Sequence, residues 1–146
     1  GRSPSEAGAG DVAPGALWVA SPQESAPPSV GTTPRLGLSF FGLYYRTRDF
    51  NSAPAFQHDG SRYFIFWSRL FEDWKIAENL AEQALCTAYV EGGRETPPWH
   101  DVHERGLGVA PTKPSTLEWS VWDATPKAFT RRRLRIWPMG CAERKK

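Results

Sequence analysis

The sequence predicts a mainly β fold, either a small antiparallel sheet or a barrel-like meander, with at most one short helix. Three observations lead to this prediction: aromatic residues gather in runs of strand length, apolar and polar positions alternate within the runs, and turn residues separate them. The 146 residues divide into a Pro/Ala/Gly/Ser-rich extended arm (1–34), a single β-rich domain (35–140) and a basic tail (141–146). A domain of this size can bury one hydrophobic core.

The first half of the domain predicts three strands. In "LGLSFFGLYYRTRDF", residues 36–50, the Phe and Tyr residues favour an extended chain that bends at Gly42. "PAFQHD" follows as a short strand opened by Pro54, and Asp59-Gly60 marks a hairpin turn because Gly tolerates positive φ. The strongest strand is "SRYFIFWSRLF". Its alternation places Tyr63, Ile65 and Trp67 on one face and Phe64, Phe66 and Ser68 on the other.

The second half opens with a mixed signal. Trp74 and Ile76 alternate as in a strand, whereas "IAENLAEQALCTA" carries good helix formers at helical spacing. We expect a strand over 74–77, a short helix or irregular turn, and a strand over 85–90. A long loop, residues 92–114, precedes two last strands, "TLEWSVWDA" and "AFTRRRLRIWPM". Leu117, Trp119 and Val121 share one face of the first. In the second, Leu134, Ile136 and Trp137 stand against basic neighbours.

The arm is nearly free of large apolar residues. Such a segment buries too little apolar surface to offset the entropy that it loses on ordering, so we expect it to be ordered against another chain. Leu17-Trp18-Val19 is its one apolar island and is predicted to bind that partner.

The charge of the chain is unevenly distributed. From Lys127 onward there are eight basic residues and one acid, Glu143, which gives +7; the whole chain carries +2, which leaves −5 for residues 1–126. A mildly acidic body with a basic end suggests an acidic partner, and a solvated basic end is the alternative. The predicted partner-binding residues are Leu17, Trp18, Val19, Trp99, Arg131, Arg132, Arg133, Arg135, Arg144, Lys145 and Lys146.

Motifs of catalysis are missing from the sequence. Neither GxxxxGK nor GxGxxG occurs, and no serine stands in GxSxG. His100 and His103 in "WHDVHER" could ligate a metal, but no third ligand follows at a motif-like spacing, so a solvated polar loop is the favoured interpretation. We therefore expect no enzyme activity, no cofactor and no metal. Cys86 and Cys141 are too few for a disulfide framework, although the two could form one disulfide bridge.

Tryptophan raises two further hypotheses. Six of the seven Trp lie in the domain, where we expect most of them to fill the core; Trp18 and Trp99 are the expected exceptions because they lie in loops. Exposed Trp rings could make a carbohydrate-binding module. Alternatively, a row of Arg131, Arg132, Arg133 and Arg135 beside Trp137 could contact RNA, or the basic tail could meet anionic lipid headgroups.

A series of turn and aromatic residues covers residues 42–99. It comprises Gly42, Tyr44, Asn51, Pro54, Phe56, Tyr63, Ile65, Phe66, Trp67, Trp74 and Ile76, with Tyr89 and Pro97–Trp99 as closing elements. The series resembles a short β repeat (NGxPxY…YLYY…WxI type) that recurs in many poorly characterised algal and protist proteins. The resemblance implies a compact antiparallel module without known catalytic residues. Ser52 stands where the repeat has Gly, and the segment 77–88 is longer and more helical than in the repeat.

Together these observations predict a non-catalytic accessory subunit of a larger organellar assembly. No apolar run reaches the length of a membrane span. The expected partners are other protein subunits of that assembly. The first expected host is a plastid photosystem, with the chain as a peripheral, thylakoid-associated subunit; mitochondrial complexes and organellar ribosomes follow. The carbohydrate-binding module and the RNA-contacting ribosomal subunit are the alternative functions.

Overall fold

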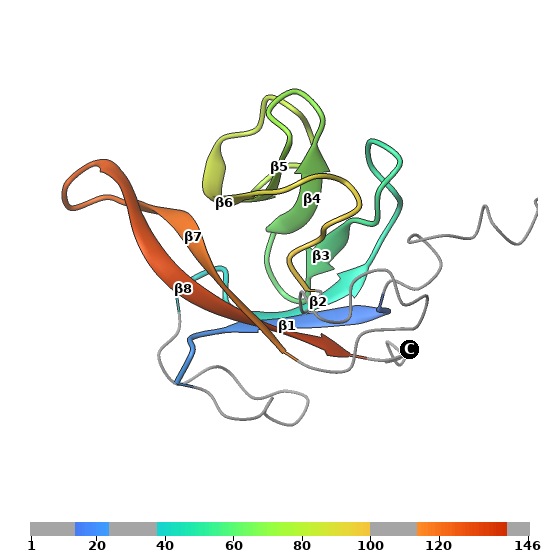
Figure 1. Cartoon of the computed structure of the whole chain (residues 1–146), viewed down its shortest axis with the longest axis horizontal. Helices are drawn as coiled ribbons and strands as arrows, with labels where there is room; N and C mark the ends of the chain where they lie inside the picture. Colours follow the sequence, from blue (N-terminus) through green and yellow to red (C-terminus); the bar gives the residue numbers. More distant parts are fainter. Residues whose placement is uncertain (1–13, 24–37, 100–113, 140–146) are drawn as a thin grey trace, which may run out of the picture.

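The computed structural model describes residues 14–23, 38–99 and 114–139, and its strands form a closed antiparallel barrel (Figure 1). Each strand pairs with the next along the chain, and the last pairs back onto the first. No helix occurs among the described residues, so the mainly β prediction is confirmed. The strands are β1 (Ala16–Ala20), β2 (Gly42–Arg46), β3 (Phe56–His58), β4 (Phe64–Ser68), β5 (Asp73–Ala77), β6 (Cys86–Glu91), β7 (Ser115–Asp123) and β8 (Ala128–Met139).

Aromatic rings fill much of the barrel core. Trp99 packs edge-on against both Phe56 and Trp74, with ring centroids 5.0 Å apart in each pair. Trp119 is also fully buried, as the sequence predicted for most tryptophans. The expectation that Trp99 is an exposed loop residue is wrong, because its side chain is only 1% exposed. The loop after β6 brings this ring back over the core, so Trp99 is a packing residue in this chain.

The predicted arm boundary at residue 34 is wrong for residues 16–20, which form β1. This strand lies between β2 and β8 and pairs with both, so its backbone hydrogen bonds are met on two sides. Leu17 and Val19 are fully buried in the core, and Trp18, on the opposite face of the strand, is 3% exposed. Closing the barrel thus accounts for the burial of Leu17 and Val19, while Trp18 lies opposite Leu43 and Trp137 in the strand register. The sequence had assigned all three residues to an exposed partner site.

Strand β4 confirms the predicted alternation. Ile65 lies in the main core, against which Tyr63 and Trp67 also pack. Phe66 points the other way and forms a second small apolar cluster with Ala55 and Ala77. Both faces of this strand are therefore covered, which explains why its sequence is apolar at nearly every position.

The turns follow the expected chemistry with one addition. Gly60 has a φ of 121° in the link between β3 and β4, as predicted. Asn51 and Ser52 both have positive φ and are flanked by a bridge between Phe50 and Ala53, the arrangement of a tight two-residue hairpin turn. The segment 78–85 between β5 and β6 is an irregular turn, the second of the two conformations predicted for it.

Candidate nucleic-acid interface

The outer face of β8 carries a row of alternating basic and aromatic positions. Successive side chains of a strand point to opposite faces, and the inward positions of β8 include the buried Leu134 and Ile136. The alternate positions therefore face outward, about 6.7 Å apart from one to the next. We call this set the β8 row: Phe129, Arg131, Arg133, Arg135 and Trp137.

Among the described residues, one carboxylate forms an ion pair with an arginine of the row. Arg131 contacts Glu118 of β7, with 3.1 Å between Nη1 and Oε1, and both side chains are more than half exposed. Glu118 lies directly opposite Arg133 in the strand register. The Nε of Arg135 donates to the hydroxyl of Thr116 over 3.0 Å. Counting these described side chains alone, three guanidinium groups and one carboxylate give a charge of +2.

An aromatic cluster stands at the end of the row nearest the hairpin tip. Trp122 of β7 lies opposite Phe129, with ring centroids 5.3 Å apart and an interplanar angle of 70°. Phe129 also packs edge-on against Tyr89 of β6. Trp122 is 46% exposed and Phe129 39% exposed, so both present ring surface to solvent. At the other end Trp137 is half-buried beside Trp18 of β1.

The β7–β8 hairpin separates the basic charge from the acidic body. It is the longest hairpin of the described structure, and its tip projects beyond the other strands (Figure 1). Residues 114–139 contain five basic residues and two acids, a charge of +3, whereas residues 38–99 contain six basic residues and eight acids, a charge of −2. The β8 row therefore lies in a segment of net positive charge, whereas residues 38–99 carry a net negative charge.

The structure separates one of the predicted arginines from the others. Arg132 lies opposite the buried Trp119 and shares the inward face of β8 with Leu134, so the predicted alignment holds for three of four arginines. Trp122 was not predicted as a site residue. Its alternation with Trp119 and Val121 places it on the outer face, which was the available signal. Arg144, Lys145, Lys146, His100 and His103 lie outside the described residues.

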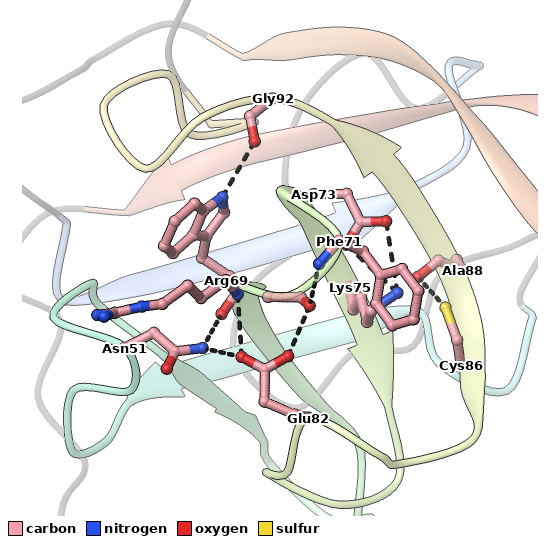
Figure 2. A network of polar contacts seen from close by, with 11 residues as sticks. Asn51, Arg69, Phe71, Asp73, Lys75, Glu82, Cys86, Ala88 and Gly92 are labelled. Atoms are coloured by element: carbon pink, nitrogen blue, oxygen red, sulfur yellow. Dashed lines mark hydrogen bonds and ion pairs between the residues drawn. The ribbon is translucent and has the colours of Figure 1, made fainter.

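A second polar cluster surrounds Glu82 in the β5–β6 turn (Figure 2). Its Oε1 accepts a hydrogen bond from Ser68 over 2.7 Å, and its Oε2 accepts from the backbone N–H of Arg69 over 2.9 Å. The side-chain amide of Asn51 donates to the same Oε2 and to the carbonyl of Trp67. Burial raises the pKa of Glu82, but these hydrogen bonds outweigh burial and leave that pKa below its ordinary value. The carboxylate is thus saturated with donors from its own chain.

Lys75 and Asp73 form a buried ion pair on the outer side of β5. Their closest atoms are 3.3 Å apart, and both side chains are less than 10% exposed. The ammonium group also lies 4.5 Å from the ring centre of Phe71, a cation–π contact that Figure 2 shows from close by. Burial raises the pKa of Asp73, although Lys75 opposes the shift. Each charge is paired and shielded from solvent, so we interpret this cluster as a structural contact of β5 and not as a substrate-binding site.

Cys86 lies near the same pair and is the one described cysteine. Its thiol donates to the carbonyl of Ala88 over 3.1 Å, and burial raises its pKa to about 11. A thiol of this kind is a weak nucleophile at neutral pH. Within 14–23, 38–99 and 114–139, no group of three or more His, Cys, Asp or Glu could hold a metal ion.

Comparisons of the chain with protein-family models, with curated proteins and with solved structures found no match. The described part of the chain has no helix long and apolar enough to cross a membrane. The β8 row is consequently the strongest candidate for a functional surface, on the basis of its geometry and charge.

Proposed function

We propose that this chain is a non-catalytic, RNA-contacting accessory module, and that the β8 row binds a single-stranded segment of RNA. The observation that carries the proposal is the order of side chains on one exposed face: Phe129, Arg131, Arg133, Arg135 and Trp137. Proteins that bind single strands combine cationic groups along the backbone with aromatic rings on which bases stack.

The spacing of the row suits an extended polyanion. Alternate residues of one strand recur about every 6.7 Å, so the guanidinium groups of Arg131, Arg133 and Arg135 can follow a backbone over about 13 Å. Guanidinium groups bind phosphate oxygens in a bidentate manner that lysine lacks. At the end of this row, the exposed rings of Trp122 and Phe129 offer surfaces for bases.

A carbohydrate-binding role has less support from the geometry. Sugar-binding platforms need two or three exposed rings in one plane, whereas Trp122 and Phe129 stand at 70° to each other. Trp18 and Trp99, the rings that the sequence suggested for this role, are buried. Trp122 is the one tryptophan classed as exposed among the described residues.

The accessory role predicted from the sequence is part of this proposal, since an RNA-contacting module fits an organellar ribosome as well as other assemblies. The plastid photosystem remains a prediction from the sequence. The contacts of the described residues do not test it.

The test is binding of a fluorescently labelled oligouridine to the full chain at increasing salt. Neutralising three phosphates on a single strand predicts a slope of log K against log salt of about −2. We expect the triple variant R131Q/R133Q/R135Q to remove this slope and W122A to weaken binding by about tenfold or more. The matched control is R62Q, because the Arg62 side chain is 78% exposed and lies in the link between β3 and β4, outside the row.

Three results would overturn the proposal. The first is no binding of oligouridine at low salt, and the second is equal loss in R62Q and the triple variant. The third is polyglutamate competing as well as RNA, because a surface that recognises only negative charge would point to an acidic protein partner instead.

A further inference from the structure

The inward face of β8 changes from apolar to cationic where the hairpin leaves the barrel. Ile136 and Leu134 are buried in the core, while the next inward residue, Arg132, is exposed. Next to this transition lies an open pocket of about 290 Å³, bounded by β8, the segment 21–23 after β1 and residues near the start of β2. A ligand there would touch both kinds of surface.

The floor of the pocket is apolar and anchored in the core. Phe41 is 6% exposed, and Phe40 packs edge-on against it with ring centroids 5.3 Å apart. Leu134 is also buried, and Leu38 is partly buried against the main core. The floor is therefore fixed by packing that does not depend on a ligand.

The rim of the pocket is cationic. Arg132 and Arg133 both line it, and no described residue forms an ion pair or hydrogen bond with either guanidinium group. Their strand neighbours differ, since Arg131 contacts Glu118 and Arg135 hydrogen-bonds to Thr116. No acidic residue occurs among the described residues that line the pocket, and Ser21 adds a neutral hydroxyl. The charge of Arg132 is thus uncompensated within the described structure.

We propose that this pocket binds a small amphipathic anion: an apolar chain or ring that carries one carboxylate. The apolar part would lie on Leu38, Phe41 and Leu134. The carboxylate would meet Arg132, which shares the inward face of β8 with Leu134. Charge-assisted hydrogen bonds of this kind are about twice as strong as neutral ones. The volume stands at the small end of ligand sites, which favours a ligand of few atoms.

This inference is independent of the RNA proposal. Arg132 points to the face of β8 opposite to the three arginines of the β8 row, so it can be changed without altering that row.

The experiment is titration of the full chain with sodium octanoate, followed by NMR, with 1-octanol and octylammonium as matched probes. We expect octanoate to bind at least tenfold more tightly than octanol and octylammonium to bind least. R132Q should weaken octanoate binding by about tenfold or more, because it removes a charged hydrogen-bond partner, and should leave octanol binding unchanged. L38Q should weaken octanoate and octanol alike, since it adds polarity where the apolar chain lies.

R62Q and R131Q serve as arginine controls, and both should bind octanoate like the parent chain. Circular dichroism of each variant verifies the fold. Failure of octanoate to bind at millimolar concentration overturns the inference, as does equal affinity for octanoate and octanol. An R132Q variant with unchanged octanoate affinity, or a control variant with equal loss, overturns it as well.

Discussion

The buried hydroxyl of Ser68 on β4 donates a 2.7 Å hydrogen bond to Glu82, a residue of the β5–β6 turn 14 positions away. The same hydroxyl accepts a hydrogen bond from the backbone N–H of Phe71. The other carboxylate oxygen of Glu82 accepts one from the backbone N–H of Arg69. With Asn51 as a further donor, one carboxylate joins three turns: 51–52, 69–72 and 78–85. Figure 2 shows these turns meeting around it.

Replacing Glu82 with Gln is expected to destabilise the barrel by about 1–3 kcal/mol, because a buried hydroxyl and a backbone donor lose a charged acceptor. The measurement is urea unfolding followed by circular dichroism. Glu78→Gln is the matched control. The Glu78 side chain is 48% exposed, and its ion pair with the exposed Arg62 is long at 3.9 Å. This substitution should therefore change the free energy of unfolding by no more than about 0.5 kcal/mol. Equal losses in the two variants would contradict the assigned role.

Glu82 and Asp73 should affect the pH dependence of stability in opposite directions. The pKa of Glu82 is lowered on folding, so its contribution is present above its ordinary pKa of 4.5 and is lost as pH falls through the folded value. The pKa of Asp73 is raised from 3.8 by burial, so its contribution declines as pH rises from 3.8 through the folded value. Urea midpoints measured between about pH 3 and pH 7 should therefore lose acid sensitivity in E82Q and gain it in D73N. The reverse pattern would show that the two carboxyl groups are misassigned.

Much of the fold could be predicted because side chains along a strand alternate between its two faces, which gives apolar residues a period of two. The alternation in "SRYFIFWSRLF" identified the faces of β4, and Asp59-Gly60 identified a turn. Strand β1 was missed because only five apolar residues, "ALWVA", stand in a segment rich in Pro and Gly. Their strand state depends on pairing with both β2 and β8, which are distant in sequence. No local pattern carries that information.

The candidate site was predictable in composition but not in geometry. The run of arginines in β8 was evident, and alternation alone separates Arg132 from its neighbours. The contact between Trp122 and Phe129 depends on the register of the β7–β8 hairpin. Glu82 gave no signal, because its side-chain donors come from Asn51, 31 positions away, and Ser68, 14 positions away.

The placement of β1 inside the barrel predicts the cost of changing Leu17. This side chain is fully buried in the main core, so Leu17→Ala should destabilise the protein by about 2–5 kcal/mol through lost burial and the cavity left behind. Leu85→Ala makes the same chemical change at a residue that is 88% exposed, and it should cost less than about 0.5 kcal/mol. Urea unfolding of both variants provides the measurement. A small loss for Leu17→Ala would mean that β1 contributes little to the barrel.

The burial of Cys86 predicts slow reaction of its thiol in the folded chain. With a pKa of about 11, the thiolate is scarce at pH 8, whereas an unfolded cysteine with a pKa of about 8.5 is substantially ionised there. Labelling by an aromatic disulfide should therefore be on the order of a hundredfold slower in buffer than in concentrated urea. The assay uses a Cys141→Ser background, so that a single thiol reports, and free glutathione in the same two solutions corrects for the effect of urea on the reagent. Rapid labelling in buffer would show that the hydrogen bond to Ala88 and the cover over Cys86 open easily, and that the region around Lys75 and Asp73 is less rigid than its packing implies.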